Sequence, residues 1–261
     1  MVAKMKLNSS IVLTGILFSV NNLLARTVAV LVHGTWATSE SWCQPGGGFF
    51  ETIKGQLVKN QIPLLNFAWS GKLSTLERLR ASQSLAALIK SYPECVKFIL
   101  ISHSHGGNVS MGASQLLSDS GQILTIYNLG TPIDFESYQP NMQSVRYCFN
   151  IFSFGDLYQP ILGYYQRVLP CHPRIYNVLL NVDGRYLNHE ELHSSMVAYS
   201  LLELGASLLK FDSTQILLAQ ICGQRLKSID VDLNLATKLV QDQKLQAAIC
   251  WQLAHPELGR N

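Results

Sequence analysis

The sequence predicts an α/β fold in which a largely parallel sheet is covered by helices on both sides. Apolar segments of strand length alternate with segments of helical spacing through most of the chain. With 261 residues, of which 48% are hydrophobic, the chain can bury a full core and is most economically one domain. We therefore expect a compact sheet of about six strands flanked by helices.

Each expected strand is an apolar run, and helices are expected between the runs. The run 26–34 is β-branched and ends in glycine, which is the pattern of a strand buried on both faces. In the helical segments, apolar residues recur at spacings of three and four. The expected strands are 26–34, 62–71, 96–101, 123–129, 145–154 and 175–182, and the expected helices are 49–59, 73–91, 108–117 and 190–209.

The domain is expected to span 26–210, with a different pattern on each side of it. Residues 211–261 carry apolar residues at helical spacing, which predicts a helical extension packed on the same domain. Residues 1–25 combine Lys4 and Lys6 with the apolar stretch 11–20 and end on a small residue. This pattern predicts a cleaved secretory signal and an exported protein, periplasmic or secreted; the alternative is a retained N-terminal membrane anchor.

The charge and the cysteine content bear on nucleic-acid binding and on disulfide bonds. Charged residues make up 14% of the chain and the net charge is +3, which gives no electrostatic footprint for nucleic acid. Six cysteines are compatible with disulfides in an exported protein, and we consider Cys222 with Cys250 as one pair. Buried free thiols are the alternative for the other cysteines.

The segment 98–110 is the most informative part of the chain, because an apolar run leads there into a Ser/His/Gly turn and then a helical segment. The turn has the form Ser-x-Ser-x-Gly, close to the G-x-S-x-G turn that exposes a nucleophilic serine. Ser104 is the expected nucleophile. Gly106 fits a sharp turn because it has no Cβ, whereas Ser102 stands where the pattern has glycine. The alternative is an ordinary strand-to-helix turn with a solvated serine.

A serine nucleophile needs a base and an acidic residue that orients the base, expected after later strands in the order acid, then histidine. Asp156 follows an expected strand and is the first choice for the acid. Asp134 and Asp183 compete with it, and each can instead cap a turn. His189 opens the last expected helix and is the first choice for the base. His193, four residues later on nearly the same side, is the alternative base.

The negatively charged oxygen that forms on attack needs N–H donors. One is expected from the backbone of His105, directly after the nucleophile. The other is expected from the turn after the first strand, most simply from Thr35. Gly34 lets that backbone approach closely, and His33 is expected to be a structural hydrogen-bonding residue rather than a second base.

A metal site is the competing interpretation of the same turn. His103 and His105 could supply half of a zinc site of the HxHxDH type. Gly107 and Asn108 stand where the aspartate and the next histidine would be required. We therefore do not expect a zinc site of this type at the turn.

Several short motifs occur in a fixed order: His33-Gly-Thr-Trp36, the loop 42–48, Trp69-Ser-Gly71, 102–109, Leu129-Gly-Thr-Pro132, Gly155-Asp156 and 189–193. Together they resemble the lipase/esterase-like members of the α/β-hydrolase family over about residues 27–200. The resemblance implies a short version of that fold without its extra N-terminal strands. It also implies a hydrolase in which Ser104, Asp156 and His189 act together, with no metal and no organic cofactor. Ser102 and the doubled histidine are departures from the family pattern.

The expected substrate is a small-molecule or lipid ester, with an ester of a lipid or acylglycerol as first choice and transient contact with a membrane or lipid surface. A thioester, an amide or an acyl transfer would use the same groups. An apolar and aromatic segment after the acid could form an acyl-binding wall or a mobile cover, or it could be plain core. Its residues are Tyr158, Pro160, Ile161, Leu162, Tyr164, Tyr165, Val168 and Leu169.

A non-enzymatic function is the competing interpretation of the whole chain, because a fold alone does not establish activity. An exported α/β-hydrolase scaffold could serve as a binding or host-interaction module. The complete set of nucleophile, acid, base and donor turn favours the enzyme.

Overall fold

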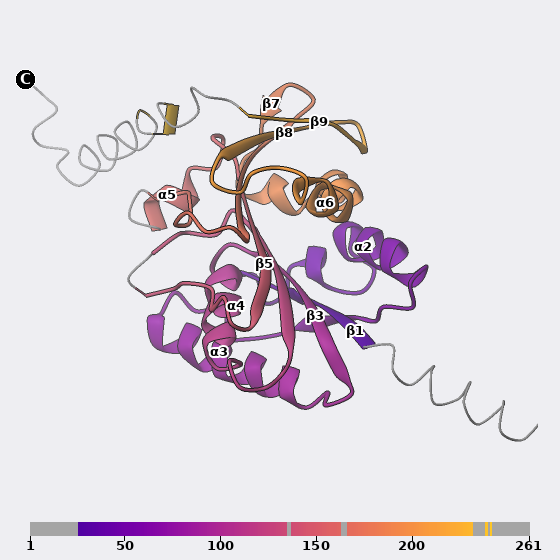
Figure 1. Cartoon of the computed structure of the whole chain (residues 1–261), viewed down its shortest axis with the longest axis vertical. Helices are drawn as coiled ribbons and strands as arrows, with labels where there is room; N and C mark the ends of the chain where they lie inside the picture. The colour runs from indigo at the N-terminus through magenta and orange to yellow at the C-terminus, as the bar shows by residue number, and fades with distance from the viewer. Residues whose placement is uncertain (1–25, 135–136, 163–165, 232–237, 240, 242–261) are drawn as a thin grey trace, which may run out of the picture.

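The computed structural model describes residues 26–134, 137–162, 166–231, 238–239 and 241. Within them, one sheet runs through the molecule with helices on both faces (Figure 1). The strand order is β2-β1-β3-β4-β5-β6-β8-β9, and β7 pairs with β6. All pairings are parallel except β6 with β7 and β8 with β9. The predicted α/β class with a largely parallel sheet is confirmed.

All six expected strands are present in the sheet. Most of their apolar side chains are buried, because helices cover the sheet from either side, whereas the edge strand β2 is largely half-buried. Their bounds are β1 (Arg26–Val32), β2 (Leu64–Phe67), β3 (Cys95–His103), β4 (Ile123–Leu129), β5 (Val145–Phe152) and β6 (Ile175–Val182).

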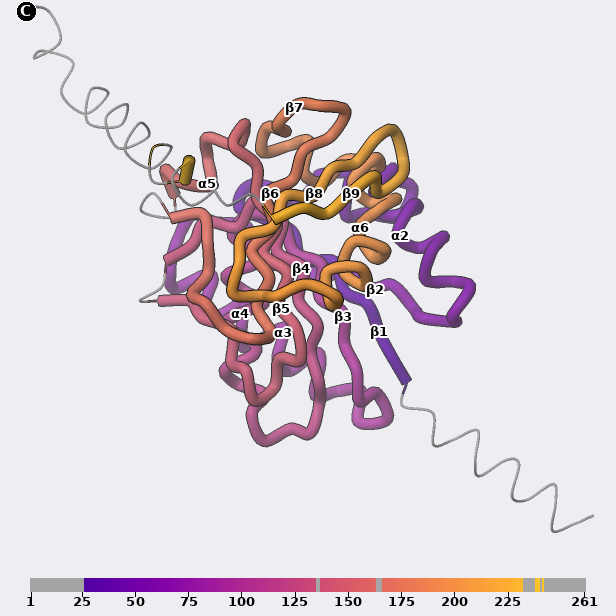
Figure 2. Tube along the Cα trace, turned by 45° about the horizontal axis from the view of Figure 1, so that its top comes forward, coloured from indigo at the N-terminus to yellow at the C-terminus, as the bar shows by residue number. Residues whose placement is uncertain are grey.

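The strand count and the structure after residue 211 differ from the prediction. The sheet has nine strands among the described residues, because it also contains β7 (Arg185–Tyr186), β8 (Ile216–Cys222) and β9 (Arg225–Val231). The prediction of helices was therefore wrong for 216–231, which form a hairpin beside β6 (Figure 2). Burial alternates along β8, so its apolar residues follow the two-residue period of a strand. Gly223, at φ +58°, makes the turn.

The four long helices cover the two faces of the sheet in pairs. α3 (Thr75–Lys90) and α4 (His105–Gln115) lie on one face, and α2 (Gly48–Val58) and α6 (Ser195–Leu208) lie on the other (Figure 1). The expected helix 190–209 is divided into the short helix η2 (Glu190–His193) and α6. Two further short helices are η1 (Ser41–Cys43) and α5 (Tyr158–Leu162).

Three predictions concern residues that lie wholly or partly outside the described part: the signal, the C-terminal helices and the cysteine pair. The predicted signal, 1–25, lies outside it, and so does most of 232–261. No helix among the described residues is long and apolar enough to cross a membrane. Cys222 is an exposed free thiol, whereas Cys250, its considered partner, lies outside the described residues. The other described cysteines are also free thiols.

Candidate active site

Ser104 lies in the turn between β3 and α4, at the edge where the parallel strands end. Its backbone has φ +54° and ψ −136°, a strained conformation for a residue with a side chain. The turn is tight on two sides. A Cβ on Gly34 would lie 2.7 Å from the Ser104 Cβ, and a Cβ on Gly106 would lie 2.3 Å from the Val32 oxygen. Both positions therefore require glycine.

Ser102 departs from the family pattern without disturbing the turn. Its side chain is fully buried, and its Oγ lies 2.7 Å from the Oγ of Ser110 on α4. The hydroxyl that glycine would lack therefore has a hydrogen-bond partner inside the strand-to-helix unit.

Asp156 and His189 are brought together from the ends of β5 and β6. The Nδ1 of His189 lies 2.7 Å from the Asp156 Oδ2. The other carboxylate oxygen, Oδ1, accepts the backbone N–H of Gln159 at 3.0 Å. Asp156 is fully buried and His189 nearly so. A buried carboxylate on Nδ1 leaves the Nε2 of the imidazole as the nitrogen able to take a proton.

The competing residues have other partners. Asp183 lies in the turn after β6, where its Oδ1 accepts the N–H of Gly223 at 2.8 Å. Asp134 lies in a turn after β4, and its carbonyl accepts the N–H of Tyr138 at 2.9 Å. His193 Nε2 lies 3.1 Å from the Glu190 Oε2 rather than beside an acid at a strand end.

Ser104 and His189 face a common pocket of about 140 Å³. Thr35, Trp36, Tyr158 and Leu162 also line it. Among the described residues the Ser104 hydroxyl has no hydrogen-bond partner, so a shared pocket rather than a hydrogen bond connects it to His189. Such links are often long before substrate binds.

The two expected N–H donors lie on adjoining segments. The Oγ1 of Thr35 lies 2.9 Å from the Nδ1 of His105, which ties the turn after β1 to the start of α4. The N–H of Trp36 donates to the Gly71 carbonyl at 2.7 Å and is therefore engaged. The backbone N–H groups of Thr35 and His105 have no acceptor among the described residues. Neither N–H group is therefore engaged by the described part of the chain.

His105 and His33 are neutral hydrogen-bonding residues. Burial, with smaller contributions from Arg78 and His189, lowers the pKa of His105 to about 3. Burial also lowers the pKa of His33. The His33 Nδ1 lies 2.8 Å from the Gly34 carbonyl, and its Nε2 accepts the N–H of Trp69 at 3.2 Å. His33 therefore has the structural contacts expected of it.

His103, which the sequence suggests only as part of a zinc site, has another contact in the structure. Its Nε2 donates to the carbonyl of His189 at 3.0 Å, and the two rings are 4.4 Å apart. Burial, with the neighbouring His189 and His193, holds the pKa of His103 well below the usual range. Because His103 and His105 contact different segments, they do not form the half-site considered above.

Gly130 is a site residue that the sequence analysis quoted in a motif without assigning it a role. It follows β4 and has φ +58°. A Cβ there would lie 2.7 Å from the Asp156 Oδ2 and 3.3 Å from the His189 Nδ1. Only glycine leaves room for the pair; its position just after a strand and before Thr-Pro was the available signal.

The segment after Asp156 is partly pocket wall and partly core. Tyr158 and Leu162 line the pocket, Leu169 is buried in the core, and Tyr164 and Tyr165 lie outside the described residues.

The buried part of this segment also holds a polar network that the sequence analysis missed. The Arg167 side chain is fully buried, with Nη1 2.9 Å from the Ser153 carbonyl and 3.3 Å from the Gln159 Oε1. Gln159 Nε2 donates to the Thr131 carbonyl at 2.9 Å. This network braces the loop that carries Asp156.

A larger cavity, about 410 Å³, lies at the opposite end of the sheet. It is lined by the start of β3, at Cys95 and Val96, and by the loop 119–122. Ligands of open α/β sheets bind outside the carboxyl ends of the strands, where Ser104 lies. The smaller pocket is therefore the candidate active site.

The strand order, the turn at Ser104 and the positions of Asp156 and His189 after later strands define an α/β-hydrolase fold.

Comparison with solved structures finds proteins that are similar to this chain, two of which are described here. An esterase from Pyrococcus furiosus matches 73% of this chain and 84% of its own, with 16% identity and a TM-score of 0.44. A proposed hydrolase of the alpha/beta superfamily from Xanthomonas campestris pv. campestris matches 87% of this chain and 99% of its own, with 12% identity and a TM-score of 0.36. The sequence matches no protein-family model and no curated protein.

Proposed function

We propose that this protein is a serine hydrolase that cleaves carboxylic esters, with Ser104 as nucleophile, His189 as base and Asp156 as the acid that orients it. The observation that carries the proposal is the His189–Asp156 contact of 2.7 Å, made by a histidine that lines the same pocket as a serine at φ +54°. This set of groups has no evident use in a scaffold that only binds.

In the first half of the proposed reaction, Ser104 Oγ attacks the ester carbonyl carbon while His189 Nε2 takes its proton. The carbonyl oxygen becomes negatively charged and accepts the N–H groups of Thr35 and His105. Asp156 stabilises the imidazolium. His189 then gives the proton to the leaving alcohol as the ester bond breaks, which leaves an acyl group on Ser104.

In the second half, a water molecule replaces the alcohol. His189 takes a proton from the water, whose oxygen attacks the acyl carbon, and then returns that proton to Ser104. The carboxylic acid leaves and the enzyme is restored. His103 and His105 take no proton in this scheme, because their pKa values are lowered mainly by burial.

The volume of the pocket favours small acyl groups over the lipid or acylglycerol ester that was first expected. Its volume of about 140 Å³ is below the roughly 300–1,000 Å³ usual for ligand pockets. Trp36 and Tyr158 at its rim are exposed and can contact a larger leaving group or a lipid surface. We retain export from the cell as part of the proposal, together with thioesters as alternative substrates.

The proposal is tested with a fluorophosphonate probe and a series of p-nitrophenyl esters from acetate to palmitate, on protein that begins at Arg26. Ser104→Ala should abolish both labelling and hydrolysis, whereas Ser102→Ala should retain part of each. Activity should be highest with the short esters. Labelling of Ser104→Ala at the wild-type level would place the nucleophile elsewhere.

The same experiment addresses the non-enzymatic alternative. A binding module would leave the probe unreacted and the esters intact in the wild-type protein. In that case, retention of an ester by a folded protein without turnover would favour the binding function.

A further inference from the structure

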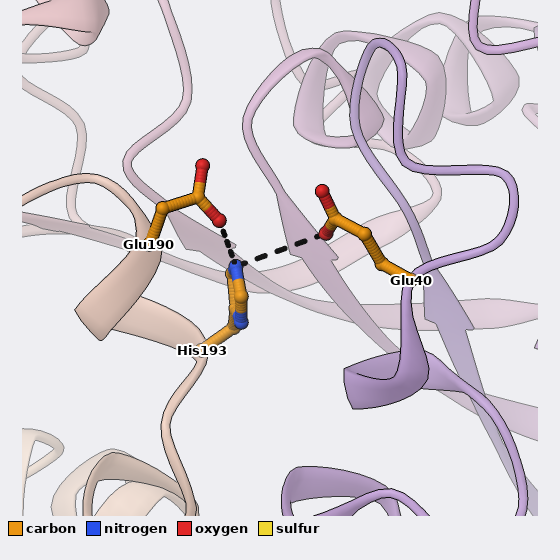
Figure 3. A group of neighbouring side chains, drawn as sticks. All are labelled: Glu40, Glu190 and His193. Carbon is orange, nitrogen blue, oxygen red and sulfur yellow. Dashed lines mark hydrogen bonds and ion pairs between the residues drawn. The ribbon is translucent and has the colours of Figure 1, made fainter.

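A second group of polar side chains adjoins the candidate active site, and two of its members, Glu40 and Glu190, line the same pocket. The proposed reaction does not use this group. Glu40, Glu190 and His193 converge on one point (Figure 3). The His193 Nε2 lies 3.1 Å from the Glu190 Oε2 and 4.0 Å from the Glu40 Oε2. Their three ligand atoms all lie within 4.8 Å of one another. Glu40 comes from the loop before η1, and the other two come from η2.

The charges of this group are not balanced by the protein. Two carboxylates carry two negative charges, and one imidazole carries at most one positive charge. Within the described residues, neither Glu40 nor Glu190 has an ion pair with lysine or arginine. The Oε2 of Glu40 is buried and has no hydrogen-bond partner in the described part of the chain. A buried carboxylate oxygen left in this state is unfavourable.

The imidazole is held in place by its surroundings. The ring of His193 stacks on Trp42, with centroids 4.9 Å apart and planes at 22°, and its other neighbour His103 lies 4.3 Å away. Only 12% of the His193 side chain is exposed. Glu190 is exposed and leaves an entry path for an ion from solvent. A fixed ring and two adaptable carboxylates make a suitable ligand set.

We propose that Glu40, Glu190 and His193 bind a divalent transition-metal cation, with Zn²⁺ as the best match to one imidazole and two carboxylates. Zn²⁺ binds such ligands at about 2.0–2.2 Å, so ligand atoms on one ion lie roughly 3–4 Å apart. The two distances from His193 Nε2 fall in this range. A water molecule completes the coordination.

The ion would connect two segments that are distant in the sequence. Glu190 directly follows His189, so the cation ties the segment of the proposed base to the loop before η1. It would neutralise the two carboxylates and hold this segment in place without touching the reacting atoms. The family resemblance implied no metal, and the sequence does not reveal this site, because the three ligands have no recognisable spacing and meet only in the fold.

The test is calorimetric titration of ZnCl₂ into EDTA-dialysed protein, together with thermal unfolding with and without the ion. We expect one ion per chain and a higher melting temperature when it is bound. Glu40→Gln and His193→Gln should each weaken binding about tenfold or more. Glu203→Gln, at a glutamate on α6 away from the cluster, should leave the affinity unchanged.

Two further variants distinguish this site from zinc binding at thiols or at the proposed catalytic serine. Cys171→Ser with Cys222→Ser removes the exposed thiols, and affinity should persist. Ser104→Ala should also bind Zn²⁺ as the wild type does, so the outcome is independent of the proposed hydrolysis. Three results would overturn the site: no saturable binding, wild-type affinity in both ligand variants, or loss of binding with the thiols.

Discussion

At the residue scale, the candidate site depends on close approaches that leave no room for a methyl group. Gly130 and Gly34 are such positions, the first against Asp156 and the second against Ser104. A side chain at either position would displace a proposed catalytic group. A displacement of about 1 Å is enough to reduce turnover by roughly a hundredfold.

Gly130→Ala should therefore reduce kcat by about a hundredfold, because the new Cβ would separate Asp156 from His189. Gly223→Ala is the matched control. It has the same φ of +58° and nothing within 4 Å of the added Cβ, so it bears a similar backbone cost away from the site. Steady-state kinetics of the two variants give the comparison, and equal losses in both would contradict the steric origin of the effect.

His103 is expected to act as a positioning residue, through its hydrogen bond to the carbonyl of His189. His103→Phe keeps a ring but removes the donor, so kcat should fall about tenfold or more with little change in KM. His103→Gln retains an N–H donor and should recover part of the loss. A raised KM with unchanged kcat would instead indicate a role in substrate binding.

At the element scale, the β8–β9 hairpin extends the sheet that positions the site. Leu217 on β8 is fully buried in the core cluster with α2 and α6, and it pairs with Val231 on β9. Leu217→Ala should lower the free energy of unfolding by about 2–5 kcal/mol. Val231→Ala, at a residue 40% exposed, should lower it by about 1 kcal/mol or less. Urea unfolding measures both, and similar losses would argue against a packed hairpin.

The elements that can be predicted from the sequence are those with a strong local signal. Six strands are predictable, because a buried parallel strand is a continuous apolar run. The hairpin 216–231 is not, because the run that begins at Ile216 fits helical and strand spacing equally well and Gly223 alone does not identify a turn.

The sequence is sufficient to propose Ser104, Asp156 and His189 as a triad, because each of them lies after an expected strand. The contacts of His103, Gly130 and Glu40 cannot be predicted in the same way. Each joins segments that meet only after the chain has folded, and no local pattern encodes that meeting.

At the scale of the whole molecule, buried histidines connect stability to pH. Burial lowers the pKa of His33, His103, His105 and His193 in the folded state. The unfolded chain binds protons at these groups below about pH 6.5, whereas the folded chain does not. The free energy of unfolding should therefore fall as the pH drops below about 6.5.

Burial lowers the pKa of His105 to about 3. Between about pH 6.5 and pH 5, this group alone should therefore lower the free energy of unfolding by about 2 kcal/mol. Urea unfolding at about pH 7.5 and pH 5 measures the total change in the free energy of unfolding from these histidines. His105→Gln removes one titrating group and should flatten the dependence. Equal stability at both pH values would show that these groups titrate alike in the folded and unfolded states.

The close contact between Gly34 and Ser104 also determines where redesign for bulkier substrates can succeed. No space can be gained at Gly34, since even a Cβ there would lie 2.7 Å from the Ser104 Cβ. The wall of the pocket instead includes two larger side chains, those of Tyr158 and Leu162. Trimming these two should enlarge the acyl space while the nucleophile and its donor turn stay fixed, so engineering effort belongs on that wall.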